Sequence, residues 1–265
     1  MHFAPSPVAW RLALPVLSLL LAVPALPQST SRRADSLLAE GAERFAHGDL
    51  KGARLSYQEA LNAAPGQFVA LHRLARVESL LAEEAGGEDA RRLLASAVER
   101  ARAAVKLCPD SAAGHLELAV ALGRQALKEG PKTQLSLSRE IKSEVDRALA
   151  VDPALGRGWH VLALWNRSLA SLNFLQRAVA KTVLGGVPRG ATMENAVADL
   201  QKAVELEPDY VNHRLELGRT YLQAKRRDAA RRELERAVSL LPTSNPLDPK
   251  YQAEARALLS RLRKD

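Results

Sequence analysis

The chain has 265 residues, of which 47% are hydrophobic and only 4% are aromatic. A composition rich in alanine and leucine but poor in aromatic residues favours helices over sheets, and the length suits one large domain or two small ones. The 38 basic residues outnumber the 30 acidic ones, which gives a formal charge of +8. Because acidic residues are interleaved with the basic ones, we expect no nucleic-acid partner.

Residues 1–25 have the features of a secretory signal peptide. Arg11 is followed by an apolar run over residues 12–26, and the small residue Ala25 lies near its end. Such a run is shorter than the ~20 residues of a membrane span, so cleavage near Ala25 is expected. An uncleaved N-terminal anchor is the alternative. The sequence therefore predicts export to a bacterial periplasm, or anchoring to a membrane through this segment alone.

A repeated pattern follows. Five prolines share one context: Pro65, Pro109, Pro153, Pro208 and Pro242. An alanine lies five residues before each of them, and a leucine followed by a small residue begins nine residues after each of the first four. Proline lacks the amide that continues a helix, so each proline marks the end of a helix pair. Small residues let two helices approach closely, and stacked pairs bury faces that one pair would expose.

The terminal units resemble the tetratricopeptide repeat. The last unit fits its 34-residue pattern at Leu217, Gly218, Tyr221, Ala230, Leu234, Ala237 and Pro242, since Pro208 and Pro242 are 34 residues apart. The first unit fits at Gly41, Ala53, Tyr57, Ala60 and Pro65, with Gly48 and Asp49 at the tight turn. The resemblance implies an all-α fold, a right-handed superhelix of about five tetratricopeptide-like helical hairpins.

The predicted repeat domain covers residues 31–242, with units at about 34–65, 68–109, 112–153, 156–208 and 211–242. The middle units exceed the standard period, and their surplus lies near residues 83–89, 128–134 and 174–192. We expect longer helices and loops there. A C-terminal capping helix over 249–265 should follow, with Asp248 as its N-cap and Pro249 at its first helical position.

A second pattern runs from roughly Glu140 to the end of the chain. It consists of Gly156, Arg157, Trp159, Arg177, the turn Gly186-Val187-Pro188, and Ala191-Thr192 before a new helix. This pattern is similar to the regulator of microtubule dynamics family. The resemblance implies a tetratricopeptide-like fold, and eukaryotic members of that family associate with microtubules or membranes. Because the leader and the composition look bacterial, we carry over the architecture and not a microtubule role.

The sequence contains no recognisable catalytic or cofactor-binding constellation. Its six histidines are never four residues apart, so the helical zinc pair is missing. The single cysteine, Cys108, excludes an intrachain disulfide. Trp159 is expected in the core, and Trp165 under the 174–192 insertion. We therefore expect a protein that is not an enzyme and that binds no cofactor and no metal.

The remaining candidate is a groove. In this architecture the first helix of each pair lines the concave face, where positions 4, 7, 11 and 14 after each proline form one stripe. The candidates for a partner-binding groove are His72, Arg76, Leu116, Val120, Arg157, His160, Arg167, Leu215, Arg219 and Leu222. Arginine offers a planar fork for carboxylates, which fits an acidic or C-terminal segment of a partner. Alternatively, these arginines are solvated or pair with nearby glutamates.

The sequence therefore predicts a non-catalytic protein–protein interaction module, an exported scaffold or adaptor that binds a protein or peptide in its concave groove. Two alternatives remain. One is a structural protein that assembles with copies of itself. The other is an enzyme or small-ligand carrier with a pocket of polar groups under the 174–192 insertion. The fold supports the class of function by analogy only.

Overall fold

The computed structural model describes residues 28–243 and 245–263, and the predicted leader lies outside this part of the chain. The described residues form twelve helices and no strand. Their bounds are α1 (Gln28–Ala46), α2 (Leu50–Ala63), α3 (Phe68–Glu84), α4 (Gly87–Leu107), α5 (Ala112–Ala126), α6 (Pro131–Val151), α7 (Gly156–Ala170), α8 (Phe174–Leu184), α9 (Met193–Leu206), α10 (Val211–Gln223), α11 (Arg227–Ser239) and α12 (Asp248–Leu262). Among the helices of the described ranges, none is long and apolar enough to cross a bilayer.

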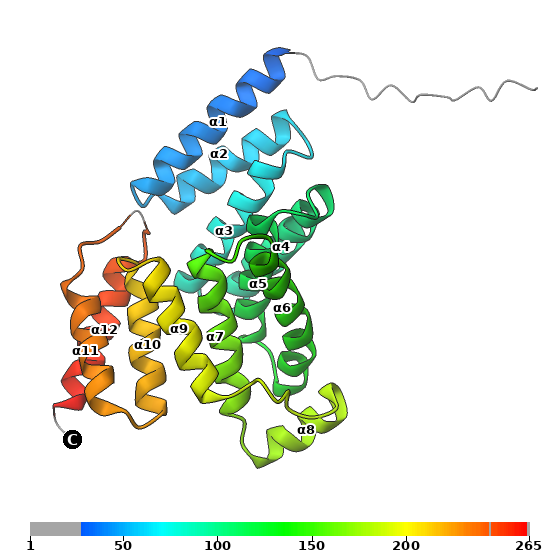
Figure 1. The fold of residues 1–265 in the computed structure, drawn as a ribbon. Coiled ribbons are helices and arrows are strands. Elements are labelled where there is room, and N and C mark those ends of the chain that lie inside the picture. Colours follow the sequence, from blue (N-terminus) through cyan, green and yellow to red (C-terminus); the bar gives the residue numbers. More distant parts are fainter. Residues whose placement is uncertain (1–27, 244, 264–265) are drawn as a thin grey trace, which may run out of the picture.

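The helices pack as stacked hairpins. The pairs are α1 with α2, α3 with α4, α5 with α6, α7 with α9, and α10 with α11 (Figure 1). The second helix of every pair ends two or three residues before a repeat proline, as the pattern predicts. The all-α superhelix of tetratricopeptide-like hairpins is thus confirmed.

Close approach within the hairpins depends on the small residues of the repeat. A Cβ atom on Gly41 would overlap the ring of Tyr57, and one on Gly218 would lie 2.7 Å from Leu234 Cγ. Gly48 takes a φ of +82°, which favours glycine, and Asp49 then caps α2 by accepting a hydrogen bond from the Gly52 amide at 2.8 Å.

The surplus residues of the middle units lengthen two helices and add one. Helices α4 and α6 each have 21 residues, against 14 in α2. The 174–192 segment forms α8, an 11-residue helix that lies against α6. The apolar residues Val179, Ala180, Val183, Val187 and Ala191 pack there into a cluster with Ile141 and Trp165.

Two sequence predictions are wrong in detail. Helix α12 begins at Asp248 itself and its N-cap is Leu247, because the Asp248 carboxylate instead accepts bonds from the amide and hydroxyl of Thr243 at 2.7 Å. Trp159 lies only half-buried, since its indole N–H reaches the Pro153 carbonyl at the surface. Trp165 is the core tryptophan, 8% exposed, and donates to the Ser138 carbonyl at 2.8 Å.

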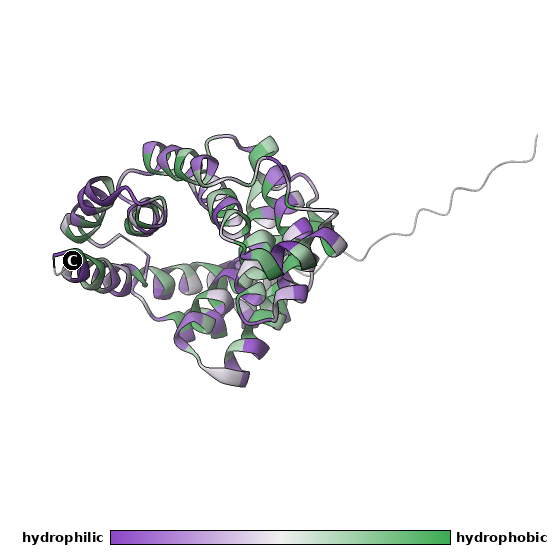
Figure 2. Cartoon of the chain, turned by 90° about the horizontal axis from the view of Figure 1, so that it is seen from below, coloured by the Kyte–Doolittle hydropathy of each residue, from purple (hydrophilic) through white to green (hydrophobic). Residues whose placement is uncertain are grey.

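The superhelix closes on itself. Seen from below, the helices curl around into a ring (Figure 2). One continuous cluster of buried side chains includes residues of α1–α3 and of α10–α12. At the junction, Lys250 and Tyr251 of α12 both contact Glu83 at the end of α3. The capping helix therefore covers the end of the repeat stack and also reaches the concave side.

Candidate partner-binding cavity

A cavity of about 560 Å³ lies inside the ring. Its walls come mainly from α3, α5, α6, α7, α10 and α12, with Gln176 of α8 at its edge. Apolar side chains line part of the wall, among them Val120 of α5, Leu164 of α7 and Leu135 of α6. Polar and charged side chains of α7, α10 and α12 line much of the rest.

The structure divides the predicted groove residues into three sets. The residues that line the cavity are Val120, Arg157, His160, Arg167 and Arg219. Leu116 and Leu215 are 2% and 0% exposed and lie in the core, and Leu222 packs against it. His72 and Arg76 are half-buried on α3. The predicted stripe of groove residues is wider than the wall of the cavity. The residues at the edges of the stripe therefore face neighbouring helices and do not line the cavity.

Arg157 is bonded to a carboxylate of the chain itself. Its guanidinium donates to Glu117 Oε1 at 2.9 Å across α7 and α5. Burial alone would raise the pKa of Glu117, but Arg157 and Arg76 outweigh burial and lower it. Glu117 is therefore a carboxylate held charged in the interior by arginines.

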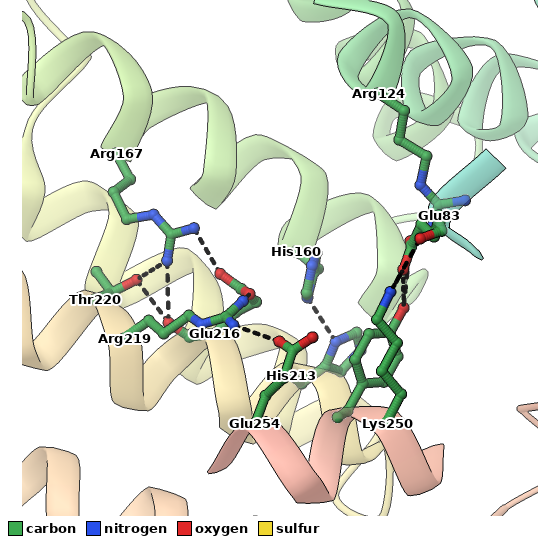
Figure 3. A network of polar contacts seen from close by, with 11 residues as sticks. Glu83, Arg124, His160, Arg167, His213, Glu216, Arg219, Thr220, Lys250 and Glu254 are labelled. Carbon is green, nitrogen blue, oxygen red and sulfur yellow. Dashed lines mark hydrogen bonds and ion pairs between the residues drawn. The ribbon is translucent and has the colours of Figure 1, made fainter. Parts of the chain in front are cut away.

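A second ion-pair network joins α7, α10 and α12 (Figure 3). Arg167 donates to Glu216 Oε2 at 2.5 Å and to Thr220 Oγ1 at 3.0 Å. Arg219 pairs with Glu216 and with Glu254. Burial would lower the pKa of Arg219, and the two carboxylates raise it instead. Three of the four predicted groove arginines are thus occupied within the chain.

Two buried histidines meet at the cavity wall. His160 Nδ1 of α7 and His213 Nδ1 of α10 are 2.9 Å apart, so one ring must donate and the other accept. His213 Nε2 lies 3.2 Å from Glu207 Oε2, which can only accept, so His213 donates there and accepts the proton of His160. Burial lowers the pKa of both histidines, most strongly that of His160, where His213 and Arg167 add to the effect.

Glu83 is the junction where the ring closes (Figure 3). It pairs with Arg124 of α5, and it lies 3.5 Å from Lys250 Nζ and 3.4 Å from the Tyr251 hydroxyl. Burial raises the pKa of Tyr251, and Glu83 raises it further, so this hydroxyl keeps its proton and donates. These contacts hold α12 against the cavity.

The alternative that the groove arginines pair with nearby glutamates is correct for Arg157, Arg167 and Arg219. The sequence did not identify which glutamates these are, because Glu117 and Glu216 lie one residue beyond the predicted stripe. Glu117 follows Leu116, and Glu216 follows Leu215. The signal that could have found them is the tripeptide Leu-Glu-Leu, which occurs at 116–118 and again at 215–217. Repetition at matching places in two units indicates a shared packing role, here the binding of an arginine on a neighbouring helix.

Beneath the 174–192 insertion lies the apolar cluster around Trp165, and the cavity reaches this region at Trp165, Leu172 and Gln176. Within the described ranges, no group of three or more His, Cys, Asp or Glu side chains is placed to hold a metal ion. The cavity inside the ring is the candidate site.

The fold defines the class of protein. The structure is similar to that of a thermophilic tetratricopeptide-repeat protein, TTC0263 of Thermus thermophilus, with a TM-score of 0.60 and 22% identity, covering 83% of this chain and 98% of that one. The chain thus has the fold of a tetratricopeptide-repeat protein. The model of a family described as Regulator of microtubule dynamics protein 1-3 matches residues 30–263. The chain belongs to this family, and the match extends far beyond the C-terminal region that first indicated it.

Individual members of this family also match the chain in sequence. The chain is 30% identical to Regulator of microtubule dynamics protein 1 of Bos taurus over 192 residues, which are 71% of this chain and 60% of the relative. It is 29% identical to Regulator of microtubule dynamics protein 3 of Mus musculus over 235 residues, 87% of this chain and 50% of the relative. The chain therefore spans only about half to two thirds of the length of these relatives.

Proposed function

We propose that the protein is a non-catalytic interaction module that holds a segment of a partner polypeptide in the cavity. The observation that carries the proposal is a cavity of about 560 Å³ on the concave side of a repeat superhelix, with apolar and charged walls. Apolar walls take up side chains, and a few placed polar groups orient the backbone of a bound segment. A segment of a few residues fits this volume, and a folded domain does not.

The state of the charged groups supports binding rather than catalysis. Glu216 and Glu254 are both paired with arginines, and Glu117 is held in its charged form by Arg157. A general acid or base instead needs a pKa brought near the working pH and a free path to substrate. These ion pairs serve to join α5, α7, α10 and α12 around the cavity.

Export is the second part of the proposal. It rests on Arg11, the apolar run 12–26 and Ala25. The names of the relatives concern microtubule dynamics, whereas a leader of this kind directs a protein away from the cytoplasm. We therefore propose a periplasmic scaffold or adaptor. Residues 1–30 fused to a reporter active only after export should give activity, and deletion of residues 12–26 should abolish it.

Cross-linking in cells tests the interaction role. A photoreactive amino acid placed at Leu164, which lines the cavity, should capture a partner segment whose mass and sequence identify it. The matched control places the same group at Leu55, which is 60% exposed on α2 and is not part of the cavity lining. Equal capture from both positions would move the interaction to the outer surface. Capture of a second copy of this chain at position 164 would indicate self-assembly.

A further inference from the structure

Helix α8 presents two large apolar side chains to water. Phe174 is 86% exposed and Leu175 is 73% exposed, and the two are adjacent in the first turn of the helix. The repeat hairpins do not cover this apolar pair, because α8 is the added helix of the 174–192 insertion and projects from the stack beside α6 (Figure 1). Single apolar residues are common on protein surfaces, whereas an adjacent pair on a projecting helix marks a candidate contact surface.

The local structure holds the apolar pair in place. Asn173 and Gln176 form a capping box, in which the backbone N–H of each residue donates to the side-chain oxygen of the other at 2.9 Å. Arg177 donates to the carbonyls of Leu172 and Ala170, at 2.9 and 3.1 Å, and so fixes the turn between α7 and α8. The opposite side of α8 packs into the apolar core. The exposure of the pair is therefore a fixed feature of the fold.

The exposed side of α8 is also basic. Phe174 and Lys181 are seven residues apart, so they share the outward side of the helix, where both are exposed. Arg177 and, in the loop after α8, Arg189 are exposed as well. Residues 153–193 contain no Asp or Glu, and within the described ranges no carboxylate forms an ion pair with any of these three cations. Their positive charge is therefore uncompensated.

An anionic phospholipid bilayer fits this combination of groups. Apolar side chains enter the boundary between lipid headgroups and acyl chains, while Lys and Arg side chains reach the lipid phosphates. Arg139 of α6 adds a further exposed cation, since its guanidinium donates to the Val183 carbonyl of α8. A nucleic acid would pair with the cations but would leave Leu175 in water.

We propose that α8 is a peripheral membrane-docking surface, which binds anionic phospholipid through the apolar pair and through Arg177, Lys181 and Arg189. The contact lies at the bilayer surface and does not span the membrane. It is separate from the partner-binding cavity and does not rest on the proposed function. It extends the sequence prediction, in which the leader is the only segment that meets a membrane.

A fluorophore on α8 tests the proposal. In the full chain, Cys108→Ser removes the native thiol, and Ala178→Cys places a polarity-sensitive label on the exposed side of α8 beside the intact apolar pair. Vesicles of phosphatidylglycerol and phosphatidylcholine in equal parts should shift the emission to the blue. Pure phosphatidylcholine vesicles should need at least about tenfold more lipid for the same shift.

The label reports its own surroundings, so membrane binding through residues 12–26 alone gives no shift at position 178. The matched control places the same label at Ala95→Cys, an exposed alanine on α4, where the emission should stay unchanged.

Two double variants separate the apolar from the electrostatic contribution. Phe174→Ser with Leu175→Ser should raise the lipid concentration for half of the shift at least about tenfold. Lys181→Gln with Arg189→Gln should weaken binding to the phosphatidylglycerol vesicles and leave binding to pure phosphatidylcholine unchanged. The control Leu55→Ser, at an exposed leucine on α2, should bind as the unsubstituted chain does.

Folding is checked by circular dichroism. All the substituted side chains of the double variants are exposed, so helicity should be equal in every protein. If the serine variant unfolded, the glutamine variant and the comparison of the two lipid mixtures would carry the test, because the lipid comparison requires no change in the docking surface.

Three results would overturn the proposal. The absence of any shift at position 178, even when the chain sediments with the vesicles, would assign membrane binding to the leader alone. Equal shifts at positions 178 and 95 would mean unspecific adsorption of the chain. A shift that appears on concentrating the chain without lipid, and that the serine variant abolishes, would show that a second copy of the chain covers the apolar pair. The peptide-binding function would stand in each case, because its test uses Leu164.

Discussion

Lys250 Nζ lies 3.5 Å from Glu83 Oε2, although 167 residues separate them in the chain. This contact joins α12 to α3 and turns an open stack of hairpins into a ring. The cavity exists because of that closure, since α3 and α12 both contribute to its wall.

Removal of the junction should loosen the ring. Glu83→Gln takes a charged partner from Arg124, Lys250 and Tyr251. The Glu83 side chain is 23% exposed, so water screens part of its charge. We therefore expect the substitution to lower the free energy of unfolding by only about 1 kcal/mol. Amides of α12 should exchange faster with solvent. The matched control Glu88→Gln removes an exposed pair with Arg91 and should change neither quantity.

Substitution of Arg157 should cost more, because it leaves Glu117 buried without its ion-pair partner. We expect Arg157→Met to lower the free energy of unfolding by roughly 3 kcal/mol, measured by urea denaturation. The double variant Arg157→Met, Glu117→Leu removes both charges and should recover most of that loss. A double variant no more stable than the single one would mean that the pair does not act as a unit.

The hairpin seam gives a pair of opposite predictions for glycine-to-alanine changes. Gly218→Ala places a Cβ 2.7 Å from Leu234 Cγ and should destabilise the protein by about 1–3 kcal/mol. Gly123→Ala, inside α5, meets nothing within 4 Å and should stabilise it by about 0.5–1 kcal/mol. Thermal melts of the two variants should therefore shift in opposite directions.

Acidification should weaken the α7–α10 contact through the histidine pair. Both pKa values are lowered in the folded state, so the unfolded chain, with histidines near 6.5, binds protons first as the pH falls. The free energy of unfolding is highest above about pH 7. Below about pH 6.5 it falls by about 1.4 kcal/mol per pH unit for each histidine, and the fall stops once the pH reaches the pKa of that histidine in the folded state. Arg124, Arg157 and Arg167 oppose protonation of His160, and Glu207 favours that of His213.

The measurement is urea denaturation at about pH 7, 6 and 5, a range above the ordinary pKa of the carboxylates, whose titration therefore contributes little. His160→Gln should flatten the pH dependence of the free energy of unfolding. His47→Gln, at an exposed histidine directly after α1, should leave it unchanged. An unaltered slope in the first variant would contradict the role assigned to the pair.

The local parts of the fold could be predicted from the sequence because they depend on short-range rules. Gly218 opposite Leu234, the turn at Gly48 and the helix ends before each proline all follow from the repeat pattern. The closure between Glu83 and Lys250 could not, because it depends on the summed curvature of all the hairpins between them.

The site could be predicted only in part. The stripe rule found the cavity-lining residues Arg157, His160 and Arg167, since helical spacing places them on one face. It did not find Glu117 and Glu216, because these lie on the flank of their helices and reach arginines of α7 in the neighbouring unit. The contrast between Arg76 and the other arginines appears only once the three-dimensional partners are known.

Entry of a partner segment into the cavity of the closed ring is the central claim. Methyl groups of leucine and valine, isotope-labelled in the full chain, report this directly by NMR when the segment captured through position 164 is added. We expect the resonances of Val120 and Leu164 to shift on addition while that of Leu55 stays in place. Shifts confined to outward-facing methyl groups, with Val120 and Leu164 unmoved, would contradict it.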